Sequence, residues 1–409
     1  TRAMGTPGYD ASVEHVADRL AEAGLEPHTE RFTMPAFFQD GPTDLAVGDR
    51  RFEDGRQVRA LLYSPPGNVA APLAPLGLDA GGPGRGGGCL AGDWGAFPAG
   101  SVALLQPGPC FRRQQVLEAQ DTGAIAVIFW FAAPAGSLLR PTLIDPAGLR
   151  VPVVGVSQDA GGALASSAGR TASLRTRTRT DVIEARSVLA EVAGTDPERV
   201  IVLGGHLDSV IDGPGVNDNG SGVALLLALA DALSGTKPEA TIRFEFWGGE
   251  ELGLWGSNAY VDLLGAERDR IGAYLNLDMV GSPNFARLVY DDRDAAEGSE
   301  AITRAFLDHF AALGLPADTI DISGRADHGA FQRAGIPTGG LFSEAEEVKR
   351  AQEAARYGGT AGEPYDACYH QACDRLQRVD VDLVVEMAAA TLAVTADLAG
   401  LERPASMAA

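Results

Sequence analysis

The sequence lacks any long apolar stretch. Its longest uninterrupted apolar run, residues 124–133, has ten residues, well below the roughly 18–20 that a bilayer-crossing helix needs. Basic residues are also scarce, 33 against 55 acidic ones, and this leaves a net charge of −22. Such a charge repels nucleic acid and anionic membranes and favours cationic partners. With 409 residues, of which 45% are hydrophobic, the chain has an ordinary globular composition that excludes a disordered or collagen-like protein.

The acidic excess is uneven along the chain. Residues 36–180 carry 13 basic and 11 acidic side chains, whereas the remainder has a net charge of −24. The same segment contains proline and glycine clusters and short apolar runs between turn formers, a texture typical of a small β-rich module. We therefore predict two domains, one formed by residues 1–35 with 181–409 and the other by the inserted residues 36–180.

Cysteine is rare, and the CxxC pattern is absent. The four cysteines form two local groups, Cys89 with Cys110 and Cys368 with Cys373. This even number predicts two disulfides and an oxidising compartment, although free thiols are the alternative and the sequence does not settle the pairing. The chain begins at Thr1 and shows no basic and apolar leader, so we expect a processed product of a secreted protein.

After residue 180, apolar strands alternate with amphipathic or apolar helices. Strands are predicted at 241–247, 273–277 and 338–342, and helices at 222–233, 255–264, 300–313 and 380–399. A helix is also predicted at 10–25, with Asp10 as its N-cap, and a hairpin between residues 187–192 and 200–203. This pattern favours the α/β class, with a mixed, mostly parallel sheet sandwiched by helices. Reactive groups should then gather at the carboxyl ends of the strands.

Two imidazoles and several carboxylates follow the ends of these predicted elements. Each has a simple structural explanation alone, but together they are the donors that bind Zn²⁺ or a similar divalent ion. The five candidate ligands are His206, Asp218, Glu251, Asp278 and His370. If Asp218 bridges, each of two ions takes one histidine, one further carboxylate, Asp218 and a shared water.

Two further acids lie beside the candidate ligands. Asp208 is close enough in sequence to orient the imidazole of His206 as an outer-shell partner. Glu250 precedes Glu251, and neighbouring side chains of an extended backbone point to opposite sides. Glu251 can therefore bind an ion while Glu250 serves as the general base for the water.

The motifs around these residues resemble the dizinc aminopeptidases of the M28 clan, and most of all their secreted Streptomyces leucyl aminopeptidase type. The motifs occur in family order and cover roughly residues 185–400 and the first 35. Residues 116–129, with QDTGAIAVI at 120–128, resemble the protease-associated (PA) domain that is inserted in many secreted peptidases. The M28 motifs are HLDS at 206–209, GVNDNGSG at 215–222, WGGEELGLWGS at 247–257, LNLDM at 275–279, YGGTAG at 357–362 and YDACYH at 365–370.

The resemblance implies a role for each matching residue. His206 and Asp278 would hold one zinc ion, Glu251 and His370 the other, and Asp218 would bridge them. The remaining roles are Glu250 as the base, Tyr369 as a donor to the developing oxyanion, Arg325 near the substrate, a cis peptide bond between Asp218 and Asn219, and a disulfide between Cys368 and Cys373. Some relatives also bind calcium near both chain ends. Asp10, Asp380 and Asp382 do not line up convincingly with that site, which leaves calcium doubtful.

The sequence thus predicts a secreted, monomeric aminopeptidase with two zinc ions that acts on peptide or protein N-termini and prefers a large apolar first residue. Spare carboxylate oxygens around the ions would hold the substrate amine, and the inserted domain would restrict access or recruit substrate. Two alternatives stay open. One is a glutaminyl cyclase-like transferase with a single zinc ion, and the other is a peptidase-like binding protein that has lost its activity.

Overall fold

The computed structural model describes residues 1–78, 87–131, 138 and 140–401. The chain divides into two compact units, one formed by residues 1–34 with the chain from residue 184 onward, the other by residues 35–183. The two division points lie within one to three residues of those predicted from the sequence. Strands β1 (His28–Gln39) and β10 (Thr178–Val192) each continue through a division point, so no turn or loop marks the junctions.

The first unit is built on an eight-stranded sheet with the order β1-β10-β12-β11-β13-β16-β14-β15. Its central strands β12, β11, β13 and β16 are parallel, whereas β10 and β14 run antiparallel to their neighbours β12 and β16. The strands after β10 are β11 (Asp196–His206), β12 (Ala240–Trp247), β13 (Ile271–Leu277), β14 (Leu288–Tyr290), β15 (Asp318–Ile320) and β16 (Thr338–Phe342).

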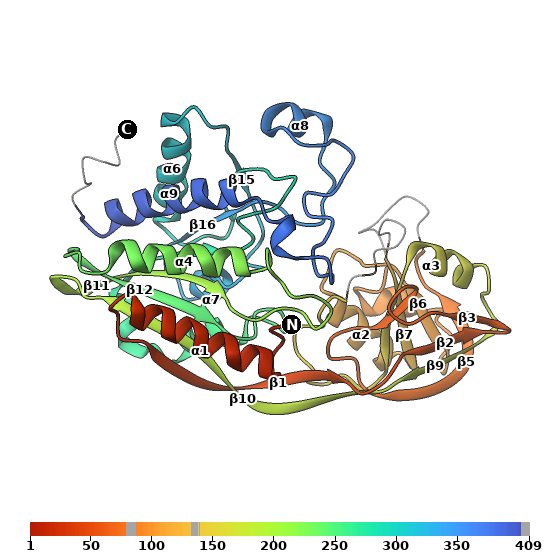
Figure 1. The fold of residues 1–409 in the computed structure, drawn as a ribbon. Coiled ribbons are helices and arrows are strands. Elements are labelled where there is room, and N and C mark those ends of the chain that lie inside the picture. The colour runs from red at the N-terminus through yellow and green to blue at the C-terminus, as the bar shows by residue number, and fades with distance from the viewer. Residues whose placement is uncertain (79–86, 132–137, 139, 402–409) are drawn as a thin grey trace. The chain divides into compact units, whose positions relative to one another are not determined.

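Helices cover both faces of this sheet. Gly205 of β11 faces α4, where an added Cβ would lie 3.4 Å from Leu226, whereas Val202 packs in a cluster with Tyr260 of α5 and Phe331 of α7. Because alternate residues of a strand point to opposite faces, α4 lies on one face and α5 and α7 on the other (Figure 1). The helices of this unit are α1 (Pro7–Glu22), α4 (Gly220–Leu233), α5 (Trp255–Leu263), η2 (Gly265–Arg270), α6 (Ser299–Ala312), α7 (His328–Arg333), α8 (Ala351–Tyr357), η3 (Leu376–Arg378) and α9 (Val381–Leu398).

The predicted fold class, a mixed and mostly parallel sheet between helices, is confirmed. Within the described residues, none of the helices combines the length and the apolar character that a bilayer crossing requires. Helix α1 begins at Pro7 rather than after Asp10, because proline is well suited to a first helical turn, and Thr6 rather than Asp10 occupies the N-cap position.

The predicted hairpin between residues 187–192 and 200–203 is wrong. Strand β12 lies between β10 and β11 and pairs with both of them, antiparallel to β10 and parallel to β11. The turn formers at 195–198 make no hairpin turn, because residues 196–198 already belong to β11. Local turn chemistry does not decide which strands become neighbours. Strand β12 begins about 40 residues after the predicted hairpin, and all of its residues except Arg243 are buried. Such a strand suits a central position in the sheet.

The second unit contains its own eight-stranded sheet, with the order β3-β2-β9-β5-β6-β7-β8-β4. Its core is a cluster of buried aliphatic side chains from these strands, together with Ala160 and Leu164 of α3, and a disulfide joins Cys89 to Cys110. Its remaining elements are β2 (Asp44–Val47), β3 (Arg50–Phe52), β4 (Val58–Ala60), β5 (Gly67–Pro75), η1 (Ala91–Trp94), β6 (Val102–Leu105), α2 (Arg112–Asp121), β7 (Ala126–Trp130), β8 (Val153–Val156), α3 (Gln158–Ala165) and β9 (Thr171–Thr176).

Three parallel strands of the first unit end at the same level. His206, the last residue of β11, is opposite Trp247, the last residue of β12, and Leu203 is opposite Leu275, two residues before the end of β13. The segments that follow these strands therefore begin side by side at one edge of the sheet. This edge is where the candidate ligands were expected.

Glu245 in the middle of β12 is an unusual core residue. It has no exposed surface, and neither of its carboxylate oxygens has a hydrogen-bond partner among the described residues. Burial, and then the nearby Glu30, raise the pKa of this carboxyl well above its usual value. The protonated form is therefore favoured in the folded chain, so Glu245 weakens the fold increasingly as the pH rises from the unfolded-state pKa of about 4.3 toward the folded-state pKa.

We expect Glu245→Gln to stabilise the protein in a pH-dependent way. The variant carries no charge at any pH, so its gain over the wild type should be near zero at pH 4.5 and should grow steadily as the pH rises to 8. Thermal unfolding across this range measures the difference. Glu198→Gln on β11, where the carboxyl is 76% exposed, is the control and should show no such trend; a pH-independent effect of Glu245→Gln would contradict the prediction.

Candidate metal centre

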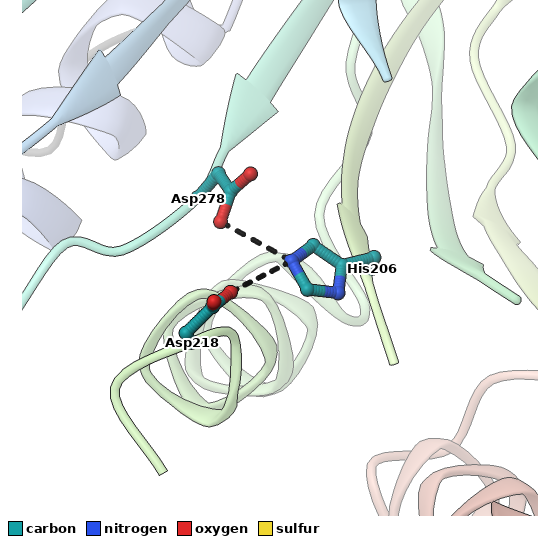
Figure 2. Close-up of side chains that lie close together, drawn as sticks. All are labelled: His206, Asp218 and Asp278. Carbon is teal, nitrogen blue, oxygen red and sulfur yellow. Dashed lines mark ion pairs between the residues drawn. The ribbon is translucent and has the colours of Figure 1, made fainter. Parts of the chain in front are cut away.

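Asp218 lies between two histidines and directs one carboxylate oxygen to each of them. Its Oδ1 is 3.1 Å from His206 Nε2, and its Oδ2 is 3.0 Å from His370 Nε2. On the His206 side, Asp278 Oδ1 is 3.3 Å from the same ring nitrogen (Figure 2). On the other side, Glu251 Oε2 is 3.0 Å from His370 Nε2. The donor atoms thus form two groups of three that share Asp218.

Three of these side chains lie at the ends of regular elements. His206 ends β11, Asp278 follows β13, and Asp218 precedes α4. Asn219 forms the N-cap of α4: its Oδ1 accepts hydrogen bonds from Gly222 N and Met279 N, and its Nδ2 donates to Leu277 O. The helix start that follows Asp218 is thereby fixed to the end of β13 next to Asp278. The peptide bond between Asp218 and Asn219 is cis, as the family resemblance implied.

The donor set fits two divalent cations. Ligand atoms around a tetrahedral zinc ion with bonds of about 2.0–2.1 Å lie roughly 3.3 Å apart, and the distances from each histidine Nε2 to the carboxylate oxygens of its group are 3.0–3.3 Å. In addition, Glu251 Oε1 and Asp278 Oδ1 are buried and have no hydrogen-bond partner among the described residues. Buried, unpaired carboxylate oxygens are costly unless they meet a cation or a donor. Imidazole and carboxylate are typical zinc ligands.

The carboxylates perturb one another because they are crowded and buried. Burial raises the pKa of Glu251 to about 7 and that of Glu250 well above its usual value, and neighbouring carboxylates add to both shifts. Burial alone would lower the pKa of His206, but Asp278 and Glu250 reverse this effect and raise it well above its usual value. The region therefore attracts positive charge strongly, as a site for two cations requires.

Asp208 contacts the Glu250–Glu251 segment more directly than it contacts His206. Its Oδ1 accepts hydrogen bonds from Gly249 N at 2.9 Å and Glu250 N at 3.1 Å, and its Oδ2 accepts one from Glu251 N at 3.3 Å. The Nδ1 atom of His206 lies 3.1 Å from the backbone carbonyl of Asp208 but 3.7 Å from its carboxylate. The outer-shell contact expected for His206 is thus made mainly by the main chain, and the Asp208 carboxylate holds the glutamate segment.

Glu250 lies slightly outside the two donor groups. Its Oε2 is 4.0 Å from His206 Nε2, farther than the carboxylates of Asp218 and Asp278. The turn that carries Glu250 begins at Gly249, whose φ of 80° favours glycine. A carboxylate next to the donors but outside their contact distance is suited to receive a proton rather than to hold an ion.

Tyr369 and Arg325 differ in how close they lie to this centre. The ring of Tyr369 stacks on His370 with 3.8 Å between the ring centroids. Burial and nearby carboxylates, Glu346 first, raise the pKa of its phenol well above the usual value, so the phenol keeps its proton and can donate it in a hydrogen bond. Arg325 is exposed, and its Nε donates to Ile322 O in its own loop. Among the described residues it forms no ion pair with the five candidate ligands.

Two residues near the centre carried no signal in the sequence. Arg2 is largely buried, and it donates from Nε to Leu207 O at 2.9 Å and from one guanidinium NH₂ group to Pro214 O at 2.6 Å. It thereby joins the segment after His206 to the segment before Asp218. Asp327 is 1% exposed, and burial raises its pKa to about 7. Their partners lie far away in the sequence, so no local motif could reveal them.

Comparison with known proteins identifies the family of the chain. The sequence profile of peptidase family M28 matches residues 187–395, and that of the PA domain matches residues 69–164. An aminopeptidase of Pseudomonas aeruginosa is 37% identical over 400 residues, which cover 93% of this chain and 74% of that protein. A probable lipoprotein aminopeptidase, LpqL of Mycobacterium tuberculosis, is 37% identical over 398 residues and 93% of this chain, with 77% of its own length covered.

The fold and the donor set define a metallopeptidase-like protein with an inserted β-rich domain. The chain belongs to peptidase family M28. The predicted resemblance to M28 aminopeptidases with a PA domain is confirmed, and so is the prediction of an enzyme of the aminopeptidase type. Among solved structures, an aminopeptidase from Aneurinibacillus sp. strain AM-1 superposes with a TM-score of 0.78 at 25% identity, covering 97% of this chain and 90% of that one. A zinc aminopeptidase from Bacillus subtilis shares the fold, with a TM-score of 0.74 at 24% identity over 97% of this chain and 90% of its own.

We expect Asp208→Asn to weaken cation binding without unfolding the protein. The amide would place an NH₂ group against at least one of the three backbone N–H donors and loosen the segment that carries Glu251. Loss of such an outer-shell partner typically lowers metal affinity about 10–100-fold. Titration of the metal-free protein with Co²⁺ measures the change, and the exposed Asp262→Asn provides the control. Unchanged affinity in Asp208→Asn would contradict this role.

Proposed function

We propose that the protein is a secreted, zinc-dependent aminopeptidase with two zinc ions, which removes the N-terminal residue of peptides. The observation that carries this proposal is the placement of Asp218, whose two oxygens lie 3.1 and 3.0 Å from the two histidines. One shared carboxylate between two complete donor groups is the arrangement that a pair of ions needs. His206 and Asp278 would hold one zinc ion, Glu251 and His370 the other.

The bound ions would polarise the scissile carbonyl group and lower the pKa of a water molecule to about 7. Glu250 would accept the proton of this water and then transfer it to the leaving amine. Its position supports this role, because its Oε2 lies 4.0 Å from His206 Nε2, next to the donor atoms but outside their contact distance. Tyr369 would donate a hydrogen bond to the oxygen that gains negative charge during the attack.

The substrate's free amino group would be held by carboxylate oxygens of the same centre. Glu251 Oε1 is a buried acceptor that lacks a hydrogen-bond partner among the described residues, and Glu251 faces His370 with its other oxygen, Oε2. A protonated amine supplies up to three donors, so it would satisfy an oxygen that otherwise remains unpaired. This need for a terminal amine favours an exopeptidase that acts at the N-terminus.

Three further features belong to the proposal. The two disulfides, Cys89–Cys110 and Cys368–Cys373, favour an extracellular location, since such bonds persist in oxidising compartments. A preference for a large apolar first residue is inferred from relatives such as the probable leucine aminopeptidase 2 of Aspergillus oryzae, which is 33% identical over 392 residues. Calcium is not included in the proposal.

We expect Glu250→Gln to abolish most hydrolysis while leaving metal binding intact. The amide cannot accept the proton, so turnover of leucine p-nitroanilide should fall about 10²–10⁴-fold, the usual contribution of a general base. Its neighbour supplies a matched control: Glu251→Gln should lose a zinc ion as well as activity. Retained hydrolysis in Glu250→Gln, with its zinc content unchanged, would refute the role of Glu250 as the base.

Zinc content separates the proposed aminopeptidase from the alternative of a glutaminyl cyclase-like transferase. We expect the dialysed protein to hold two zinc ions per chain by elemental analysis, and we expect a chelator to remove the activity and added Zn²⁺ to restore it. One tightly bound ion per chain, together with pyroglutamate formation from peptides that begin with glutamine, would favour the cyclase. Two bound ions without hydrolysis of any aminoacyl substrate would favour an inactive binding protein.

A further inference from the structure

Asn217 connects three of the segments that carry the candidate ligands. It has no exposed surface and directly precedes Asp218. Its Nδ2 donates to Asp366 Oδ2 at 2.8 Å and to Ser282 Oγ at 3.1 Å, and its Oδ1 accepts from Gly281 N at 3.2 Å. The segment after Asp278 and the segment before His370 are thus both joined to the residue next to Asp218.

Asp374, which follows His370 in the sequence, binds the backbone of the segment that carries Asn217 and Asp218. It is 1% exposed; its Oδ1 accepts a hydrogen bond from Asn217 N at 2.8 Å, and its Oδ2 accepts one from Asp218 N at 3.2 Å. Both oxygens are therefore used, each on a different backbone donor. The carboxylate fixes the main chain of Asp218 itself, whose side chain lies between the two histidines.

The disulfide between Cys368 and Cys373 closes a short ring that contains His370. Asp366 lies two residues before this ring. Its Oδ1 accepts a hydrogen bond from Cys368 N at 2.8 Å, and its Oδ2 accepts one from Asn217 Nδ2. Asp374 follows Cys373 directly. The two carboxylates thus flank both ends of the ring and bind the two adjacent residues Asn217 and Asp218.

The hydrogen bonds inside the ring, by contrast, join near neighbours. Gln371 N donates to Cys368 O, and Tyr369 N donates to Asp366 O. Such bonds set the shape of the ring but not its position relative to Asp218. The distance of 3.0 Å between His370 Nε2 and Asp218 Oδ2 needs a link between the ring and the Asp218 segment, and Asp366 and Asp374 supply one.

We propose that Asn217, Asp366 and Asp374 form a positioning frame that holds the His370 ring at bonding distance from Asp218 and so builds the second metal site. This inference rests on the proposed function, because it assigns a task to residues around the same centre. Asp374 is a positioning residue, since it acts through Asp218 and His370. The site of Asp218, Glu251 and His370 depends on the frame more than the site of His206, Asp218 and Asp278, because only the former includes a ligand from the ring.

The test uses Asp374→Asn in the full chain. An asparagine keeps one acceptor oxygen but places an NH₂ group against the second backbone donor, so at least one of the two hydrogen bonds is lost. We expect the second ion to bind about 10–100-fold more weakly, the usual effect of losing an outer-shell partner, and the first ion to bind within about threefold of the wild type. The control is Asp269→Asn, where the side chain is 81% exposed; it should behave as the wild type.

Two measurements on the metal-free proteins distinguish positioning from general destabilisation. Calorimetric titration with Zn²⁺ alone gives the affinity of each ion, and titration with Co²⁺ alone gives visible absorption bands that report the geometry around each ion. Positioning predicts that only the second ion loses affinity and that only its Co²⁺ bands change. Equal weakening of both ions, or two ions bound as in the wild type, would overturn the positioning frame.

Asp366→Asn keeps the inference testable if Asp374→Asn does not give a circular dichroism spectrum of the folded protein. This substitution removes an acceptor of the Asn217 amide, so the second ion should again bind more weakly than in the wild type. Unchanged affinity for that ion would overturn the proposal. Metal binding by the wild-type protein distinguishes failure of the proposed function from failure of the positioning frame. If the unmodified protein binds neither Zn²⁺ nor Co²⁺, the proposed function itself fails, whereas two ions in the wild type and two equally tight ions in both variants contradict only the frame.

Discussion

Several carboxylates are crowded into a buried region at one edge of the first unit's sheet, and the surrounding contacts must hold them there. Asp218, Glu250, Glu251 and Asp278 converge on two imidazoles, and the mutual repulsion of their charges opposes this arrangement in the absence of cations. The raised pKa values of Glu250 and Glu251 are the direct result of burial and of this repulsion. A protein that keeps such a cluster must hold it by other contacts, and it gains from any cation that enters.

The main chain supplies most of these contacts. Asp208 and Asp374 lie outside the two donor groups; they accept hydrogen bonds from backbone N–H groups of the segments that carry Glu250, Glu251 and Asp218. Negative charge outside the ligand set is thus used to fix the backbone of the ligands. Hydrogen bonds to charged acceptors are stronger than those between neutral groups, which suits them to a task that requires short and stable distances.

The parallel strands explain why one edge of the sheet can hold all of this. Strands β11, β12 and β13 end at nearly the same level, so the first residues of three separate loops lie side by side. The start of α4 is joined to the same edge, because Asn219 Nδ2 donates to Leu277 O and Asn219 Oδ1 accepts from Met279 N. The peptidase family M28 fold therefore concentrates ligands where neighbouring strands end, and the inserted second unit leaves this sheet complete.

Some predictions from the sequence failed for identifiable physical reasons. The hairpin between residues 187–192 and 200–203 was inferred from turn residues, but β12 separates the two strands because strand order follows from burial over the whole sheet. The Asp208 carboxylate lies 3.7 Å from His206 Nδ1, as expected beside that imidazole, but its hydrogen bonds to the backbone of residues 249–251 were not predicted. Such a contact joins residues about 40 positions apart, and sequence spacing carries no information about it.

The sequence alone indicated the fold class, the limits of most of the helices and strands that it predicted to within about three residues, and the five residues proposed as ligands, because periodicity, turn formers and motif chemistry are local properties. Only the tertiary structure decided that both oxygens of Asp218 face a histidine, that Arg2 and Asp374 hold the segments around it, and that Arg325 lies against its own loop. These contacts join residues up to about 200 positions apart. Their partners are selected by packing and by the need of each buried polar group for a hydrogen bond, and neither condition is written in any short stretch of the chain.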